Sequence, residues 1–214
     1  MSLVLHDWEL CADSYRARLL LGVLGLAYAR VPVDVVPGRE TDTPAFRALS
    51  PAGTMPVLVD DGIVVCDIGA ILVHLAERHD LAGAWLPLEP GRRARCLERL
   101  AFALGPLRAS DAARRAAIFE ASVAPEDPPL ADPQPAARAA LRGLESLLAR
   151  QALAEEGFLV DGGATLADLA AFPAAALAID WGEDLALLPL TRLWTRRVRA
   201  LPGFVTTPGV PEFL

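Results

Sequence analysis

The chain has 214 residues, of which 53% are hydrophobic and 22% are charged, and its formal net charge is −7. This composition is typical of a globular protein, while the acidic balance and the scattered cations give no support to binding of nucleic acid or of an anionic membrane. Three cysteines without a spaced framework, no signal-peptide pattern and no charge-free apolar run of about 18 residues lead us to expect a cytoplasmic protein without a membrane span.

The first residues predict a β-α-β unit. Residues 2–6 form a short apolar run, and residues 14–25 place apolar side chains at helical spacing up to Gly25. Residues 28–35 alternate and are β-branched, which predicts a second strand, and Pro32 would place it at a sheet edge or a bulge. This order implies a parallel strand pair joined by a right-handed crossover.

The next segment completes a small α/β domain. Its predicted elements are a short helical turn, two strands and a helix, at residues 44–49, 57–60, 63–66 and 68–79. Asp61-Gly62 between the two strands is a strong hairpin signal, and Asp67 is available to cap the helix. Residues 1–80 therefore predict a thioredoxin-type domain with a half-parallel, half-antiparallel sheet.

Beyond a linker at residues 81–89, the strand pattern disappears. The segment 90–214 predicts an all-α domain with helices at 90–104, 106–121, 136–155, 166–180 and 189–200. Five prolines within 124–135 predict a loop. Thr165 and Asp168 form a capping box, with Asp in place of the usual Glu.

Cys11 is the first candidate for chemistry, because it lies between the first strand and the first helix. Unpaired N–H groups and the positive end of the helix dipole stabilise a thiolate at such a position. Arg16 and Arg18 would add to this effect, and Asp13 would oppose it. A small buried residue without chemistry is the alternative interpretation.

Two further positions carry weaker signals. Met55-Pro56 follows a turn, and the Asp67-Ile68 pair opens a helix, where either an anion site or a plain N-cap is possible. The three histidines show no metal-ligand spacing, so we expect no metal.

Taken together, four segments resemble the glutathione transferase superfamily over nearly the whole chain. They are Cys11 to Leu20, Leu49 to Leu58, Asp61 to Arg78 and Gly163 to Phe172. The resemblance implies a thioredoxin-like N-terminal domain that binds glutathione, followed by an all-α helical-bundle domain. It also implies a homodimer.

The resemblance implies roles for individual residues. Cys11 falls where theta- and zeta-like members carry a serine that activates glutathione and where omega-like members carry a cysteine. Pro56 is expected to follow a cis bond, and the main chain of Met55, next to Thr54, would pair with the cysteinyl part of glutathione. Asp67 would hold the glutamyl part.

Two departures from the family pattern stand out. Ile68 replaces the usual Ser or Thr that donates to the glutamyl carboxylate, and losing that bond costs about 1–3 kcal/mol, or ten-fold or more in affinity. Arg39 is the nearest cation where many members place a His or Lys that contacts glutathione.

The leading hypothesis is an enzyme that uses glutathione on a small hydrophobic electrophile. Cys11 would act as the nucleophile of thiol transfer, or Cys11 or Ser14 would polarise the glutathione thiol for conjugation. Apolar side chains at an acceptor site would be Trp8, Leu10, Phe102 and Leu107. The alternative is a non-catalytic dimeric scaffold that binds a partner, with a glutathione site weakened by Ile68. A reader of chlorinated or aromatic catabolites is a third interpretation that no residue distinguishes.

Overall fold

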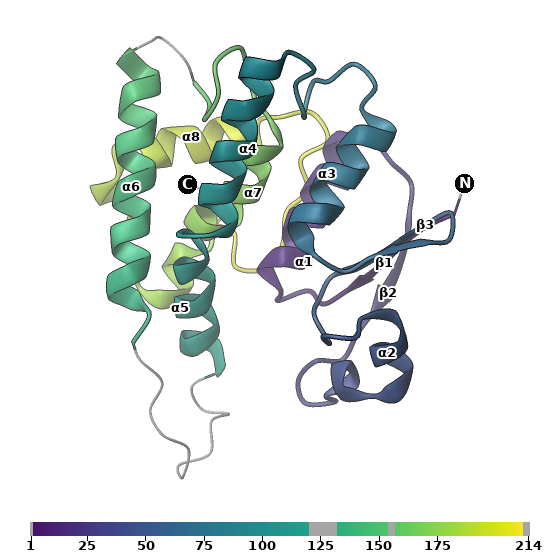
Figure 1. Ribbon diagram of the computed structural model, residues 1–214. Coiled ribbons are helices and arrows are strands. Elements are labelled where there is room, and N and C mark those ends of the chain that lie inside the picture. Colours follow the sequence, from purple (N-terminus) through teal and green to yellow (C-terminus); the bar gives the residue numbers. More distant parts are fainter. Residues whose placement is uncertain (1, 120–131, 154–156, 212–214) are drawn as a thin grey trace. The chain divides into compact units, whose positions relative to one another are not determined.

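A computed structural model describes residues 2–119, 132–153 and 157–211, and the chain divides into two compact units (Figure 1). The N-terminal unit comprises Met1–Leu86 together with Pro202–Pro208, and the C-terminal unit comprises Pro87–Leu201 with Gly209–Leu214. Among the residues described, none of the helices has the length and apolar character that a bilayer crossing requires.

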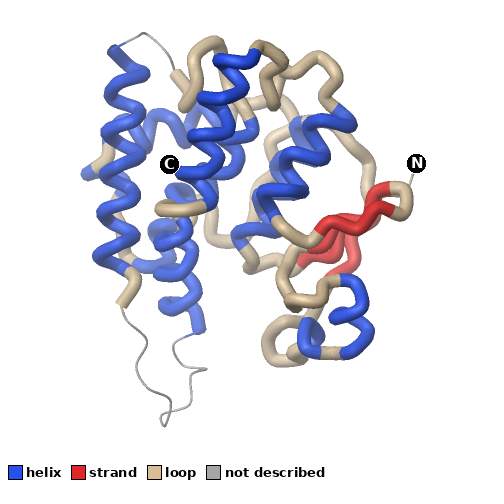
Figure 2. The backbone as a smooth tube through the Cα atoms, viewed as in Figure 1, coloured by secondary structure: helices blue, strands red, loops and turns tan. Residues whose placement is uncertain are grey.

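The N-terminal unit contains one mixed sheet, drawn in red in Figure 2. Its four strands are β1 Leu3–Asp7, β2 Ala29–Pro32, β3 Val57–Asp60 and β4 Ile63–Val65, in the order β2-β1-β3-β4. β1 pairs with β2 in parallel and with β3 antiparallel, and β3 pairs with β4 antiparallel. This arrangement confirms the predicted thioredoxin-type sheet.

β2 is shorter than the predicted strand at 28–35. It lies at the edge of the sheet with all four residues exposed, as Pro32 indicated. Pro32 has no N–H to donate and is the last residue of the strand. The chain stays close to β1 for one more residue, since the Val33 N–H donates to the Asp7 carbonyl at 2.9 Å.

Three helices complete this unit: α1 Ala12–Val23, α2 Pro44–Leu49 and α3 Ile68–His79. α2 and α3 begin and end as predicted, because Thr43 and Asp67 cap them with their side chains. α1 begins two residues earlier than predicted, since Cys11 is its N-cap. α1 and α3 lie side by side (Figure 1).

The segment 202–208 packs on α1, which the order of elements along the chain does not predict. The Tyr15 hydroxyl donates to the Val205 carbonyl at 2.9 Å. Two glycines permit the close approach: a Cβ on Gly22 would lie 2.5 Å from the carbonyl oxygen of Gly203, which itself has a φ of 77°.

The C-terminal unit is helical throughout its described part. Its α-helices are α4 Pro90–Leu104, α5 Arg108–Phe119, α6 Gln134–Leu153, α7 Leu166–Ala176 and α8 Pro189–Arg199. α7 is shorter than the predicted helix at 166–180, because a separate 3-10 turn forms at Ala178–Trp181. A second 3-10 turn covers Leu185–Leu187.

Part of one prediction lies outside the described residues. The predicted proline-rich loop at 124–135 falls mostly within 120–131, which the structure does not describe. Gln134 and Pro135 already belong to α6, where Pro135 fits because the first turn of a helix has no N–H to lose.

The predicted capping box at the start of α7 is present. The Thr165 N–H donates to Asp168 Oδ2 at 2.9 Å, and Asp168 lies at the third helical position. All eleven residues of α7 are buried, so this helix forms the centre of the C-terminal unit.

Candidate active site

Cys11 lies at the N-terminus of α1, where its sulfur caps the helix by accepting the Ser14 N–H at 3.4 Å. Cys11 is half-buried and keeps part of its surface exposed. Ser14 is fully buried, and its hydroxyl oxygen accepts the Trp8 N–H at 3.4 Å. Of the two candidate nucleophiles, only Cys11 therefore has accessible surface.

The electrostatics around Cys11 differ from the expectation. Burial raises the pKa of the Cys11 thiol, and the Asp13 carboxylate raises it further, while the N–H of Ser14 lowers it. The helix start does favour the thiolate, as predicted, but the atoms packed around the sulfur outweigh it. The expectation of a stabilised thiolate at this position is therefore wrong, because burial raises the pKa of the thiol.

The two arginines expected beside Cys11 are paired with other carboxylates. Arg16 is fully buried and donates to Asp13 at 2.8 Å. Arg18 donates to the buried Asp7 at 2.5 Å. Neither guanidinium is among the groups that lower the pKa of Cys11.

The second group of predicted residues precedes β3. The bond between Met55 and Pro56 is cis, which confirms that expectation, and a second cis bond at Val36-Pro37 was not predicted. Neither the N–H nor the C=O of Met55 has a hydrogen-bond partner among the described residues. Both groups therefore remain available to an extended ligand.

A small network fixes the chain before Met55. The buried Ser50 hydroxyl accepts the Thr54 N–H at 3.0 Å. The Thr54 hydroxyl in turn donates to the Cys66 carbonyl at 3.3 Å. This bond joins the segment before β3 to the start of α3, so Thr54 and Asp67 belong to one site.

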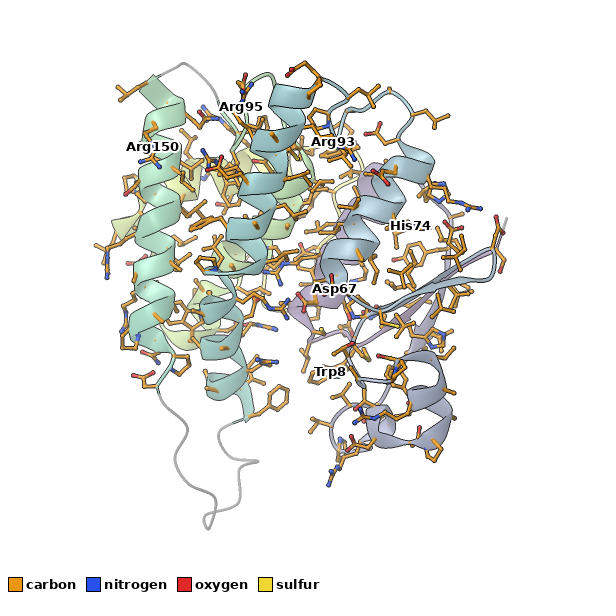
Figure 3. All side chains as sticks on the ribbon, viewed as in Figure 1. Trp8, Asp67, His74, Arg93, Arg95 and Arg150 are labelled. Atoms are coloured by element: carbon orange, nitrogen blue, oxygen red, sulfur yellow. The ribbon has the colours of Figure 1, made fainter. Side chains whose placement is uncertain are left out.

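Asp67, labelled in Figure 3 at the first turn of α3, is exposed and accepts the Ala70 N–H at 3.0 Å. This is the N-cap role that the sequence left open beside the ligand role. Ile68 is buried, with 4% of its surface exposed, so its side chain contributes to the core at this position.

Arg39 stands apart from these residues. Its side chain is 81% exposed and pairs with Asp42 at 3.0 Å. Within the described ranges, its side chain makes no hydrogen bond or ion pair to Cys11, Met55 or Asp67.

A groove of about 570 Å³ lies beside the loop between β1 and α1. Its lining includes Trp8 and Leu10, two of the four side chains proposed for an acceptor site, and Trp8 is labelled in Figure 3. It also includes Asp7, Arg30 and Pro208, and no local sequence pattern brings Arg30 and Pro208 together with residues 7–10, because they are far apart in the chain. Phe102 and Leu107, the other two predicted lining residues, belong to the C-terminal unit.

No group of three or more His, Cys, Asp or Glu able to hold a metal ion occurs in the described ranges. The arrangement as a whole offers a half-buried cysteine, an unpaired main-chain segment and an exposed carboxylate at a helix start.

Comparison with known proteins places this arrangement in context. Residues 5–84 match the family described as glutathione S-transferase, N-terminal domain. The maleylacetoacetate isomerase of Pseudomonas aeruginosa is 39% identical over 93 residues, which are 42% of this chain and 43% of that protein. Glutathione S-transferase Z1 of Arabidopsis thaliana is 34% identical over 77 residues, 36% of this chain and 34% of that protein. The chain thus spans less than half the length of these curated relatives.

Solved structures extend the likeness to the full length. The glutathione S-transferase from Xanthobacter autotrophicus is 31% identical, with a TM-score of 0.83 and coverage of 100% of both chains. That from Pseudomonas fluorescens is 27% identical, with a TM-score of 0.82 and coverage of 96% of this chain and 98% of the other.

Proposed function

The chain belongs to the glutathione S-transferase family, and from this premise we propose that it binds glutathione in its N-terminal unit and transfers it to a small hydrophobic electrophile. The observation that carries the proposal is the unpaired main chain of Met55. A peptide-like ligand can add to such a segment as an extra strand, with its thiol directed to the start of α1.

Three groups divide the binding of glutathione between them. The Met55 N–H and C=O would pair with the cysteinyl part. The exposed Asp67 carboxylate would accept from the glutamyl ammonium, and the N–H groups at the start of α3 would donate to its carboxylate. Thr54 holds these two elements together through its bond to Cys66.

The raised pKa of Cys11 favours conjugation over thiol transfer. The glutathione thiol loses its proton to solvent, and a protonated Cys11 can donate its S–H to the resulting thiolate and stabilise it. The glutathione sulfur then forms a bond to the electrophilic carbon. The electron pair of the broken bond leaves with the displaced group.

Thiol transfer through Cys11 is the second candidate, favoured by the part of the Cys11 surface that stays exposed. The Cys11 thiolate would attack the glutathionyl sulfur of a mixed disulfide and release the substrate thiol. A second glutathione would then reduce the Cys11–glutathione disulfide and leave as glutathione disulfide. This route requires a thiolate at Cys11, which burial opposes.

Isomerisation is a further candidate reaction, because one relative is named maleylacetoacetate isomerase.

The test is calorimetric titration of the full chain with glutathione, followed by two assays on wild type, Cys11→Ser and Cys11→Ala. We expect wild type to bind. In conjugation of a chlorodinitrobenzene, Cys11→Ser should keep activity and Cys11→Ala should lose most of it, because only the hydroxyl replaces the S–H donor. If instead both variants lose reduction of a glutathione mixed disulfide while conjugation is absent throughout, the thiol-transfer route holds.

The non-catalytic scaffold remains the competing proposal, since Ile68 supplies no hydroxyl at the glutamyl carboxylate. No binding by wild type and clear binding by Ile68→Ser would establish the scaffold and end the enzymatic proposal.

We further propose that the protein is a cytoplasmic homodimer, as the family resemblance implies. Sedimentation velocity would test the dimer, and localisation of a tagged chain would test the compartment.

A further inference from the structure

Asp7 at the end of β1 forms a charged cluster with Arg18 of α1 and Arg30 of β2, in which positive charge is in excess. Asp7 is fully buried, and its two oxygens accept from Arg18 at 2.5 Å and from the Nε of Arg30. One carboxylate thus faces two guanidinium groups.

Arg18 also donates to two neutral oxygens. Its second terminal nitrogen donates to the Thr207 hydroxyl at 2.9 Å and to the Glu9 carbonyl at 3.3 Å. Asp7 compensates only one of the two positive charges. Because Arg18 is only 6% exposed, Arg30 is the guanidinium that presents the excess positive charge to solvent.

Arg30 lies on the wall of the groove, with 39% of its side chain exposed. The only other acid in the groove lining is Glu9, which is 57% exposed and lies 4.0 Å from Arg30. An ion pair of that length and exposure contributes little. The second terminal nitrogen of Arg30, Nη2, makes no hydrogen bond to any described residue.

The rest of the groove is apolar. Leu10, Pro32, Val33 and Pro208 line it together with the indole of Trp8. A wall of this kind suits a ligand with a flat or aliphatic body, while the exposed edge of the guanidinium suits a carboxylate, which it can meet with two parallel hydrogen bonds.

We infer that this groove binds a small organic acid, with its apolar body against Trp8 and Leu10 and its carboxylate on Arg30 in competition with Glu9. Arg30 thus selects acidic ligands over neutral ones of the same shape. The inference rests on the proposed function only where it identifies this acid with the acceptor of glutathione; the binding itself requires no glutathione.

The experiment compares phenylacetate with phenylacetamide, which has the same shape and no charge. Calorimetric titration of the full chain without glutathione should show phenylacetate binding about ten-fold more tightly, as expected for a charge-assisted contact. Arg30→Met, which keeps the apolar stem, should abolish this preference. Glu9→Gln should tighten phenylacetate and leave the amide unchanged.

Equal binding of the two ligands to wild type, or no binding of either, would overturn the inference, as would a preference that survives in folded Arg30→Met. Circular dichroism checks the folding of that variant, because it removes one partner of the buried Asp7. Should it not fold, the comparison of the two ligands in wild type and in Glu9→Gln decides the question alone. Glutathione binding is measured separately on the same wild-type protein, so failure here is distinct from failure of the proposed function.

Discussion

The Trp194 indole N–H donates to Asp168 Oδ1 at 2.9 Å, and both side chains are fully buried. This bond ties α8 to the capping box of α7, because the same carboxylate accepts the N–H groups of Thr165 and Leu159. The carboxylate that starts the central helix of the C-terminal unit is thus also its link to the last helix.

Replacing Trp194 with Phe should lower the free energy of unfolding by about 1–3 kcal/mol. The variant keeps an aromatic ring in the core but removes one donor to a buried carboxylate. Urea denaturation measures the loss. Trp85→Phe is the control, since Trp85 is half-buried and its N–H to Asp80 comes from the main chain, which the substitution keeps. A loss no larger in Trp194→Phe than in the control would contradict the role given to this bond.

Replacing Asp13 with Asn should lower the pKa of the Cys11 thiol. Burial and the N–H of Ser14 stay as they are, and the negative charge that raises this pKa is removed. The ultraviolet absorbance of the thiolate, titrated against pH, follows the change, and Cys11→Ser supplies the background from Cys66 and Cys96.

The reactivity of Cys11 gives a second readout of the same change. Alkylation by iodoacetamide at neutral pH should be faster in Asp13→Asn than in wild type, because more of the thiol is ionised. An unchanged or raised pKa would show that Asp13 does not act on the sulfur. A melting curve accompanies the titration, since the buried Arg16 loses the charge of one partner.

Replacing Ile68 with Thr should tighten glutathione binding about ten-fold or more. The new hydroxyl would donate to the glutamyl carboxylate, a bond to a charged group. Ile68→Val is the matched control, since Val has the shape of Thr without the hydroxyl, and its affinity should equal that of wild type. Calorimetry measures both.

Both substitutions at this position have a stability cost, because Ile68 is 4% exposed. Ile68→Val should lose about 0.5–1.5 kcal/mol, and Ile68→Thr should lose more because it also buries a hydroxyl. Equal affinity of the Thr and Val variants would mean that the side chain at this position does not reach the ligand.

Local sequence signals predict the bounds of a helix or strand correctly where a turn or a capping residue determines them. α2, β3 and α3 have the predicted bounds because Thr43, Asp67 and the Asp61-Gly62 turn act on neighbouring residues. The bond from Tyr15 to Val205 spans 190 residues, and no local pattern announces such a contact. The sequence likewise does not predict that Asp7 pairs with both Arg18 and Arg30, because no local pattern links these three residues.

In the candidate site, too, the features set by neighbouring residues were predictable from the sequence, and those set by tertiary packing were not. The position of Cys11 at the start of α1 follows from the local pattern, and so does the N-cap role of Asp67. The raised pKa of Cys11 does not, because it depends on how many atoms pack around the sulfur. A motif gives the location of a reactive group, while tertiary packing determines its protonation.

The last prediction concerns Asp60, which is fully buried at the end of β3. Its Oδ2 lies 3.0 Å from the Nε2 of His74, 3.0 Å from the Nε2 of His79 and 3.1 Å from the Nε of Arg78, and Figure 3 labels His74 on α3. Among the described residues its other oxygen, Oδ1, has no partner. Three side chains of α3 thus hold the helix to the sheet through one carboxylate oxygen.

The contribution of Asp60 to stability should depend on pH. Burial opposes its ionisation, but the hydrogen bonds from His79 and His74 and the charge of Arg78 hold its pKa below the ordinary value. A carboxyl group whose pKa is lower in the folded than in the unfolded state stabilises the fold above the unfolded pKa of about 3.9, and this stabilisation is lost as the pH falls through the folded value.

Asp60→Asn should therefore be less stable than wild type by about 3–5 kcal/mol at neutral pH, as for a broken buried ionic network. The difference should shrink as the pH falls below about 4, where Asp60 of the unfolded wild-type chain takes up a proton, and should be smallest below the folded pKa, where the folded carboxyl is protonated as well. Urea denaturation across this pH range measures it, with Asp61→Asn, an exposed neighbour, as the control that should lose less. If the Asn variant does not fold, Arg78→Gln removes one contact and should show a smaller difference with the same pH dependence. A difference that stays constant down to the acid transition would show that the charge of Asp60 does not stabilise the attachment of α3 to β3.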